Sequence, residues 1–453
     1  MDFTKSALFL DVSKVLRYAK DPTGVLVDIT IHPDDQTVVK PLRFLSRDYN
    51  QDFGNNYSDI ILVTVAVTGS DFAKVIYPNR SNLYITMKDT LTGVISGEIL
   101  KNSFSYTERY KAIMLDDQGN PILEHVGRNS VDTAQLDLNE VREVTFQLLS
   151  QPINQLRMMN AGRVFHRTTG EKLIRSIFSE AFGNLNLDEG VRPLGIDIAK
   201  IDNETQYQQL IIPHGTLLPE IPDLLQNKLC GLYNAGLGNY YTRRYWRIFP
   251  LYNTDRQEQL GKSLTIINVP ATVLPSVEKT YMTEGEHTTV LATGTINFAD
   301  ESEQRQLNDG NALRFADANN FIENRATVEG NKLFYKRNKN VTEVTTAQRG
   351  DNLNFAPVTS TRITANVFAE YSRMVRREGG IVTLMWEFAN PYILEPGMSL
   401  KLLYLDGDRI RELKGTLVAV QSYTHSTEKI TFSKRFRTNC ALAIFVNRRD
   451  AYL

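Results

Sequence analysis

The side chains that most often carry chemistry in proteins are few in this chain and lie far apart. The chain has 453 residues with 6 histidines and 2 cysteines. The histidines are His32, His125, His166, His214, His287 and His425. Cys230 and Cys440 have no cysteine or histidine neighbours at metal-ligand spacing, so we expect two free thiols in a reducing compartment. We expect each histidine to be a surface or hydrogen-bonded residue rather than a catalytic base.

Two short runs contain residue types that other proteins use to bind a dinucleotide or a calcium ion. Gly236-Leu237-Gly238 is similar to a dinucleotide loop, but it follows a predicted helix and lacks the third glycine. The run 116–120 (DDQGN) lacks the full ligand series and the closing glutamate of a calcium loop. We therefore predict a loop at the first run and a hairpin turn at the second.

Motifs of the common enzyme and metal classes are absent from the sequence. It has no HExxH, no cysteine pair with zinc spacing, no Walker loop and no GxSxG elbow. The sequence therefore predicts no cofactor, no metal and no enzymatic activity. A carboxylate pair for glycoside hydrolysis stays open, because with 52 acidic residues some pair can always meet in space.

Arginine and aromatic side chains are interleaved at Arg243, Arg244, Tyr245, Trp246 and Arg247. Such a cluster suits single-stranded nucleic acid, and it equally suits a protein interface, where Tyr, Trp and Arg are enriched. The formal net charge of −1 does not favour nucleic acid, because counterion-release binding needs a strongly positive face. We predict a protein interface here. The alternative is that Trp246 points into the core while the arginines are solvated.

The composition is that of a globular protein, with 42% hydrophobic and 23% charged residues. At roughly 150 residues per domain, the length indicates about three domains. The longest apolar runs, such as 60–67 and 441–446, are far shorter than the ~20 residues that span a bilayer. The N-terminus has no apolar stretch of signal-peptide length. We expect a protein that does not enter membranes and that is made in a cytoplasm.

The elements that must position these residues are mostly strands. In the first third of the chain, predicted strands cover residues 60–67, 83–87, 110–115, 121–126 and 141–149. The run 110–115 should face 121–126 across the turn at 116–120. In 141–149, alternation puts Val144 and Phe146 on one face of the strand and Thr145 on the other.

Two helices are predicted next. Thr168 and Glu171 have the spacing of a capping box, and Gly183 should end the first helix. The apolar stripe of this helix is Leu173, Ile174, Ile177, Phe178 and Ala181. The second helix should run from about Pro219 to Asn234 and end at Gly236, with Cys230 on it as an inert core residue.

The remainder of the chain returns to β structure. Predicted strands are 245–249, 263–269, an exposed threonine-rich strand at 288–298, and then 381–388, 399–404, 411–421 and 429–436. Residues from about 300 to 362 should form a long polar excursion or short elements rather than a packed core. The last four strands should make a small barrel or sandwich. Its core should contain Val382, Leu384, Trp386, Leu400, Leu402, Leu417 and Val420.

Two passages and the order of elements resemble the hub proteins of phage baseplates. The first passage is 144–153 (VTFQLLSQPI), followed by 154–159, by 163–174 (RVFHRTTGEKLI) and by an amphipathic helix. The second passage is 394–402 (LEPGMSLKL), 413–420 (LKGTLVAV), 423–425 (YTH) and 430–436 (ITFSKRF), which look like the closing barrel of those hubs. Together they cover about half of the chain.

The resemblance implies a homotrimeric ring at the tip of a contractile tail. Each subunit would contain two similar β-barrels, so that three subunits imitate sixfold symmetry. Such a ring joins the tail tube to the central spike, contacts other baseplate proteins in the virion and has no catalytic activity. The alternatives are a tail-associated cell-wall or glycan hydrolase and a receptor-binding or glycan-binding module.

The expected fold class is α+β, mostly β, with two small barrel-like domains, a helical connector and a polar insertion. We expect an N-terminal segment at 1–55, a first barrel-like domain at 56–155 and the connector at 156–240. A second β block at 241–380, which includes the polar excursion, and closing strands at 381–453 should follow.

Overall fold

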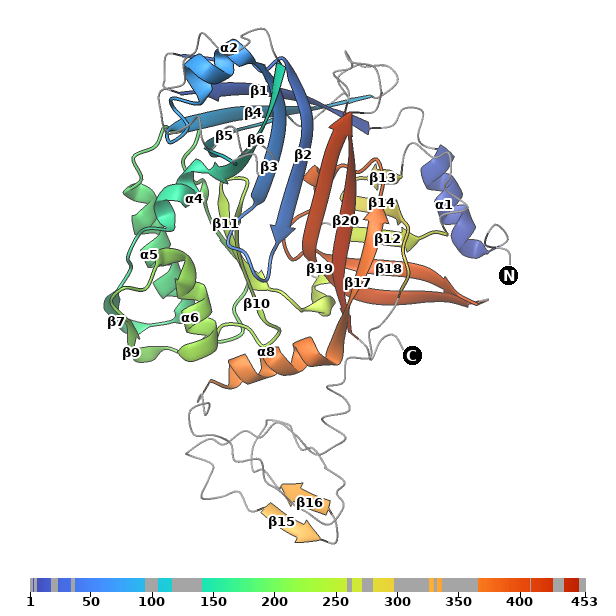
Figure 1. The fold of residues 1–453 in the computed structure, drawn as a ribbon. Coiled ribbons are helices and arrows are strands. Elements are labelled where there is room, and N and C mark those ends of the chain that lie inside the picture. Colours follow the sequence, from blue (N-terminus) through green and yellow to red (C-terminus); the bar gives the residue numbers. More distant parts are fainter. Residues whose placement is uncertain are drawn as a thin grey trace.

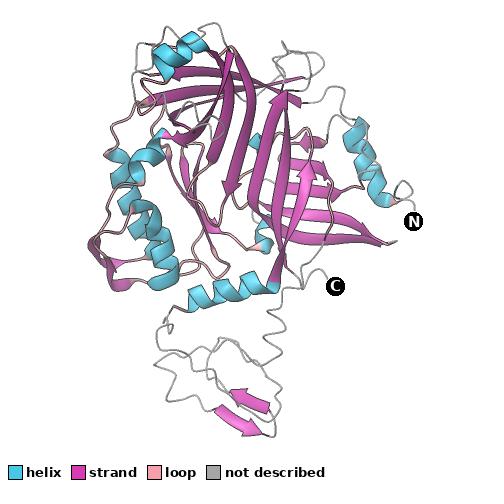
Figure 2. Ribbon diagram, viewed as in Figure 1, coloured by secondary structure: helices cyan, strands magenta, loops and turns pink. Residues whose placement is uncertain are grey.

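The computed structural model describes residues 3, 6–17, 23–33, 37–93, 105–115, 141–258, 263–270, 280–296, 326–329, 332–335, 366–407, 409–426 and 436–447. Within these ranges the fold is α+β and mostly β, as predicted, with the helices at the periphery of the sheets (Figure 2).

The first of two barrels, barrel A, is closed by eight described strands. They are β1 (Thr23–His32), β2 (Arg43–Asp52), β3 (Ile60–Thr68), β4 (Leu83–Gly93), β5 (Ser105–Met114), β6 (Val141–Ser150), β19 (Arg409–Ser426) and β20 (Phe436–Asn447). Their order is β19-β2-β3-β6-β5-β4-β1-β20, and β20 pairs back onto β19. Every neighbouring pair is antiparallel. The contact of β1 with β20 rests on Val25 opposite Phe436.

Barrel B uses the same last two strands. Its other strands are β12 (Ser263–Asn268), β13 (Tyr281–Glu284), β14 (His287–Ala292), β17 (Gly379–Trp386) and β18 (Ser399–Asp406). The order is β13-β14-β12-β18-β19-β20-β17, with β12 parallel to both of its neighbours. The ring closes where Thr293, directly after β14, exchanges backbone hydrogen bonds of 2.8 and 2.7 Å with Met385 on β17.

The two barrels therefore share a ribbon made of β19 and β20 (Figure 1). One edge of β19 pairs with β18 through residues 409–416 and then with β2 through 419–425. Its other edge pairs with β20 along residues 415–426, with a bulge between Leu417 and Ala419. Each barrel is thus discontinuous in sequence and is completed by the same C-terminal strands.

The barrel interiors bear out the strand patterns of the sequence. Val144, Phe146 and Leu148 lie in the core of barrel A. All the residues predicted to pack together in the last block lie in the core of barrel B: Val382, Leu384, Trp386, Leu400, Leu402, Leu417 and Val420.

Leu417→Ala is expected to destabilise the protein by about 2–5 kcal/mol, because it leaves a cavity in the core of barrel B. Lys414→Ala on the same strand, at a half-exposed position, should change the free energy of unfolding much less. Urea unfolding of the two variants checks this, and equal losses would contradict the strand phase.

Residues 151–250, called the connector below, join the barrels. Its elements are α4 (Gln151–Leu156), β7 (Arg163–Thr168), α5 (Gly170–Gly183), β8 (Gly195–Ile198), β9 (Tyr207–Ile212), the 3-10 turn η4 (Leu218–Glu220), α6 (Ile221–Lys228), β10 (Leu237–Thr242) and β11 (Tyr245–Pro250). The strands form a sheet in the order β10-β11-β8 and a separate pair of β7 with β9. The connector has its own apolar core, which includes the predicted stripe of α5.

The ends of the connector helices differ from the predictions. The cap of α5 is Thr169 rather than Thr168, and its hydroxyl accepts a 3.3 Å hydrogen bond from the Lys172 amide. The second helix ends at Lys228, so Cys230 lies beyond it. The chain turns back there because the Gln226 side chain bonds the backbone of 232 and 233, and Gly231 has φ of +74°. Burial raises the pKa of the Cys230 thiol to about 11, which keeps it protonated.

The remaining described elements are α1 (Ala7–Arg17), α2 (Gly69–Asp71), the π turn η2 (Phe72–Ile76), the 3-10 turn η5 (Thr254–Glu258), β15 (Ala326–Glu329), β16 (Lys332–Tyr335), α8 (Val367–Glu378) and the 3-10 turn η8 (Pro391–Ile393). Helix α1 packs Leu8, Val12 and Val15 on the outside of barrel B. No helix among the described residues is long and apolar enough to cross a membrane.

One strand prediction is wrong, and one strand was not predicted. The strand at 288–298 was expected to be exposed, but β14 carries Val290 in the core of barrel B and Leu291 under α1, so both faces are covered. The last strand begins at Phe436 and contains the apolar run 441–446, which had not been predicted as a strand. The predicted partner strand 121–126, its turn at 116–120 and residues 429–435 lie outside the described residues.

Candidate functional site

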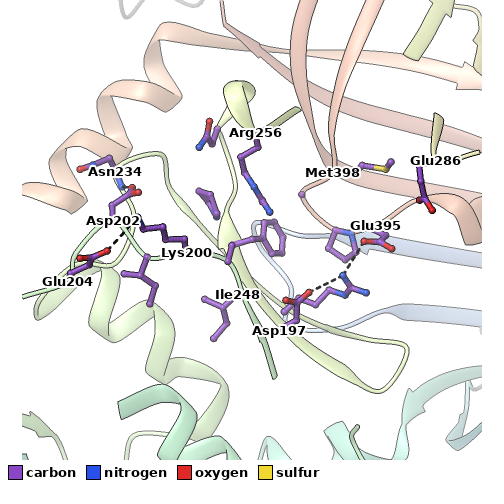
Figure 3. A pocket seen from close by; sticks show the side chains of 18 residues that line it. Asp197, Lys200, Asp202, Glu204, Asn234, Ile248, Arg256, Glu286, Glu395 and Met398 are labelled. Carbon is purple, nitrogen blue, oxygen red and sulfur yellow. Dashed lines mark hydrogen bonds and ion pairs between the residues drawn. The ribbon is translucent and has the colours of Figure 1, made fainter. Parts of the chain in front are cut away.

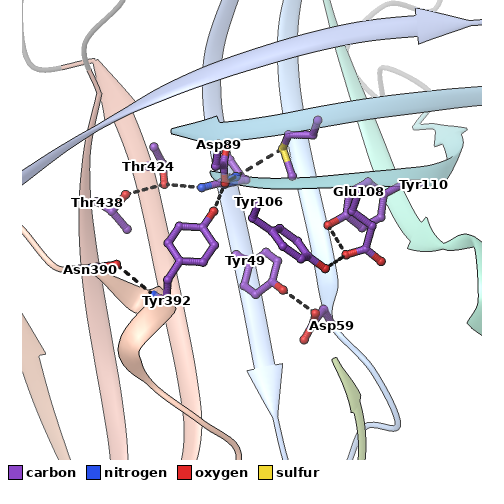
Figure 4. Close-up of polar contacts among 12 residues, drawn as sticks. Tyr49, Asp59, Asp89, Tyr106, Glu108, Tyr110, Asn390, Tyr392, Thr424 and Thr438 are labelled. Atoms are coloured by element: carbon purple, nitrogen blue, oxygen red, sulfur yellow. Dashed lines mark hydrogen bonds and ion pairs between the residues drawn. The ribbon is translucent and has the colours of Figure 1, made fainter. Parts of the chain in front are cut away.

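The two barrels and the connector meet at one end of barrel A, where the barrel interior becomes polar (Figure 4). Three acidic side chains, Asp59, Asp89 and Glu108, lie buried or largely buried there and accept hydrogen bonds from all three bodies. We call these residues and their donors the carboxylate junction. The sequence analysis named none of them.

Asp59, directly before β3, joins barrel A to the connector. Its donors are Tyr49, Gln51 (2.9 Å), Tyr240 (2.7 Å) and Thr242 (3.1 Å). The first two belong to β2 and the other two to β10. Burial raises the pKa of Asp59, although the hydrogen bonds act in the opposite direction. One carboxyl thus holds two separate strands through four donors.

Glu108 on β5 is enclosed in a similar way. Its carboxyl accepts from the hydroxyls of Tyr106, Tyr110 (3.0 Å) and Ser150 (2.8 Å). Burial raises its pKa, and the nearby charge of Asp59 adds to the increase. Asp59 and Glu108 are therefore surrounded by donors of the chain itself, which is the environment of a structural carboxyl rather than of a general acid open to substrate.

Asp89 on β4 forms a buried ion pair with Arg47 on β2. The Nη1 to Oδ2 distance is 2.5 Å, and the side chains are only 4% and 3% exposed. Burial tends to lower the pKa of Arg47, but the charge and hydrogen bond of Asp89 outweigh it and raise the pKa, so the guanidinium stays charged. Asp89 also accepts from Tyr392 of η8, and Arg47 donates to Thr424 on the shared ribbon at 3.5 Å. This pair therefore links barrel A to parts of barrel B.

Stability should depend on pH through Glu108. Because its pKa is raised by folding, its contribution is complete below the ordinary carboxyl pKa of about 4 and is lost as pH rises through the raised value. Glu108→Gln removes this titration while keeping an acceptor. The free energy of unfolding of the variant, relative to the parent, should therefore increase as the pH rises from about 4 through the raised pKa of Glu108. Urea unfolding at several pH values measures the difference, and a constant difference would contradict the assignment.

The predicted interface cluster lies at the turn between β10 and β11. Arg243 and Arg244 occupy that turn with φ of 50° and 66°. Arg243 donates to the carbonyls of Pro391 and Leu394, both at 3.2 Å. Arg244 donates to the carbonyls of Arg192 and Glu189 at 2.7 and 2.5 Å. Both arginines are therefore bonded within the chain, and Arg243 ties the connector to barrel B.

The other three residues of the cluster follow on β11. Trp246 is fully buried in the connector core and donates to Asn239 at 2.7 Å, as the alternative reading of the cluster expected for this residue. Tyr245 is 38% exposed. Arg247 lies 3.3 Å from both Asp197 and Glu395, the latter in barrel B. Binding of a partner protein at this cluster stays a prediction.

A cavity of about 1010 Å³ opens between the connector and barrel B (Figure 3). Its charged lining residues are Asp197, Lys200, Asp202, Glu204, Arg247, Arg256, Glu286 and Glu395. Arg247 spans the two bodies at this cavity. Among the described residues, no group of His, Cys, Asp and Glu is arranged to hold a metal ion.

The described histidines lie on separate elements: His32 in β1, His166 in β7, His214 after β9, His287 in β14 and His425 in β19. His287 bonds the Ser263 hydroxyl at 2.6 Å, and His425 accepts from Arg437 at 2.7 Å. Burial, assisted by Arg437, lowers the pKa of His425. His125 lies outside the described residues.

Comparison with known proteins gives structural neighbours only. No protein-family model matches the chain, and no curated protein matches it. The tail protein from Neisseria meningitidis MC58 is similar with a TM-score of 0.44 and 10% identity over 93% of this chain and 96% of that chain. The 43 kDa tail protein of prophage MuSo2 from Shewanella oneidensis has a TM-score of 0.39 and 8% identity over 92% and 96%.

A third similar structure is the c3393 protein of E. coli, described as a component of the type VI secretion system with structural similarity to the T4 bacteriophage tail proteins gp27 and gp5. Its TM-score is 0.40, with 8% identity over 92% of this chain and 76% of that chain. At these identities and TM-scores the likeness assigns no function. The three structures named here are described as phage-tail or secretion-system proteins.

Proposed function

We propose that this chain is a structural protein of a phage tail or a related injection machine, and that it forms the hub ring joining the tail tube to the central spike. The observation that carries the proposal is the pair of closed barrels fused along one shared ribbon. Three such chains around an axis would present six barrels, which suits a sixfold tube on one side and a threefold spike on the other.

An adaptor of this kind must hold its barrels at a fixed angle. The shared ribbon supports this, because a strand that belongs to two barrels leaves no hinge between them. The carboxylate junction and the contacts of Arg243 and Arg247 fix the connector to both barrels. Rigid coupling of the parts suits assembly better than a site that must open for substrate.

We also propose that the chain has no catalytic activity of its own. The described acids with raised pKa are Asp59, Asp89, Glu108 and Asp223. None of these four lines the cavity between the connector and barrel B. They bond to tyrosine, threonine, asparagine or arginine side chains of the chain itself. The partners expected for the ring are further copies of this chain, the spike, the tube and other baseplate proteins, in the virion.

Light scattering of the purified chain, alone and with its tube or spike partner, tests the proposal. The expected mass of the ring is about three times the 51.5 kDa of one chain, with threefold symmetry in electron micrographs of the assembly. A chain that stays monomeric with both partners present would contradict the ring. Release of soluble sugars from bacterial cell walls, or binding to a glycan array, would instead favour the hydrolase or the receptor-binding alternative.

A further inference from the structure

Strand β8 is an edge strand beside the cavity. It pairs with β11 on one side and ends the sheet β10-β11-β8, and no other described strand pairs with it. Asp197 in its middle is 59% exposed. A strand with an open edge offers backbone donors and acceptors to an added strand.

The cavity continues from this strand. Asp197 lines it, as do Ala199 and Lys200, which follow β8 directly. The facing wall belongs to barrel B and comes from Glu286 and residues 395–398. The cavity has a volume of about 1010 Å³, and its lining combines charged side chains with apolar ones such as Phe249 and Met398. Such a mixed lining suits an extended peptide segment better than a wholly apolar small molecule.

One cation in the cavity makes no ion pair or hydrogen bond within the described part of the chain. Arg247 is shared by Asp197 and Glu395, and Lys200 lies 3.7 Å from Glu204. Arg256 of η5 forms no ion pair or hydrogen bond with a described residue. Figure 3 shows its side chain pointing into the cavity.

The Arg256 side chain is partly buried, and this burial lowers its pKa, although the charges of Tyr233 and Asp197 act in the opposite direction. The charge of Asp197 acts on Arg256, but Asp197 makes its ion pair with Arg247. A partly desolvated guanidinium without an ion pair of its own is unfavourable, and an entering carboxylate would correct this by a charge-assisted, two-point contact. Asp202 and Glu286 at the same cavity also form no ion pair with described residues. They would repel a segment that is acidic throughout.

We propose that this cavity receives an extended segment of a partner tail protein, which adds a strand to the free edge of β8 and places a single Asp or Glu side chain against Arg256. The inference rests on the proposed function, since it supposes that the chain works within an assembly. Backbone hydrogen bonds to β8 supply affinity, and the contact with Arg256 selects segments that carry one acid among neutral or basic residues.

Amide hydrogen exchange tests the strand addition. Exchange at residues 195–198 is measured in the purified chain and in tail particles that contain it. We expect it to slow at least about tenfold on assembly, because edge amides become hydrogen-bonded. Normal incorporation into particles with unchanged exchange at 195–198 would overturn this inference and leave the proposed function standing. Failure of the parent chain to enter particles would overturn both.

Variants of Arg256 test its proposed contact with an acidic side chain of the segment. Arg256→Gln is expected to lower incorporation into particles at least about tenfold while the melting temperature stays equal or rises, because a desolvated unpaired charge is removed. Arg256→Lys should keep most of the incorporation. Lys200→Gln is the matched control, since this lysine lines the same cavity but is 89% exposed and already near Glu204. Equal incorporation of Arg256→Gln and Lys200→Gln would overturn the proposed role of Arg256.

Discussion

Arg47→Met is expected to lower the free energy of unfolding by about 3–5 kcal/mol, the usual loss when one partner of a buried ion pair is removed. Asp89 would be left in the interior without its counter-charge, and among the described side chains Tyr392 would remain as its donor. Urea unfolding at neutral pH measures the loss.

Two further variants separate the charge from the packing. In Arg47→Met combined with Asp89→Leu no unpaired charge remains, so a large part of the stability should return. Arg163→Met removes an exposed pair with Glu180 and should change stability little, because water screens exposed ion pairs. A similar small loss for Arg47→Met and Arg163→Met would show that the Arg47 pair is not buried in solution.

Asp59→Ala is expected to cost about 4 kcal/mol or more, because it removes the shared acceptor of four donors. Of these donors, Gln51, Tyr240 and Thr242 are buried and could not turn to water. Removal of the Asp59 carboxyl should also loosen the contact between β2 and β10. Limited proteolysis should then cut the connector faster than it does in the parent.

Asp59→Asn is the informative comparison for Asp59→Ala. It keeps one carbonyl acceptor and the shape of the side chain, so its loss should lie between those of the parent and of Asp59→Ala. Asp255→Ala, at an exposed position, should leave stability nearly unchanged. Equal stability of Asp59→Ala and Asp255→Ala would mean that Asp59 does not hold the connector to barrel A.

The parts of the fold that sequence could predict are those in which one strand face is apolar. Val144, Phe146 and Leu148 alternate with polar residues and point into barrel A, as expected from period two. Strand β2 gave no such signal, because its buried positions include Arg47 and Gln51. A strand whose inward side chains are charged or polar has the same pattern as a surface segment.

The junction could not be found from sequence for a related reason. Asp59 and Glu108 are ordinary acids in the sequence, and their burial depends on donors up to 183 residues away, such as Thr242. The cluster around Trp246 did carry a signal, since arginine and aromatic residues gather where surfaces meet. The signal does not tell whether the surfaces belong to one chain or to two, and in this structure Arg243 and Arg247 contact barrel B of the same chain.

The shared ribbon also sets the order in which the chain can finish folding during synthesis. Ribosomes release a chain from its N-terminus, and domains ordinarily fold as units as they emerge. Here β19 and β20 come after every other described strand, so until residue 447 has emerged both barrels lack the strands that close them. The edges of β2 and β18 stay unpaired in this interval, and open edges are sites where chains aggregate. Neither barrel can therefore reach its closed form ahead of the other.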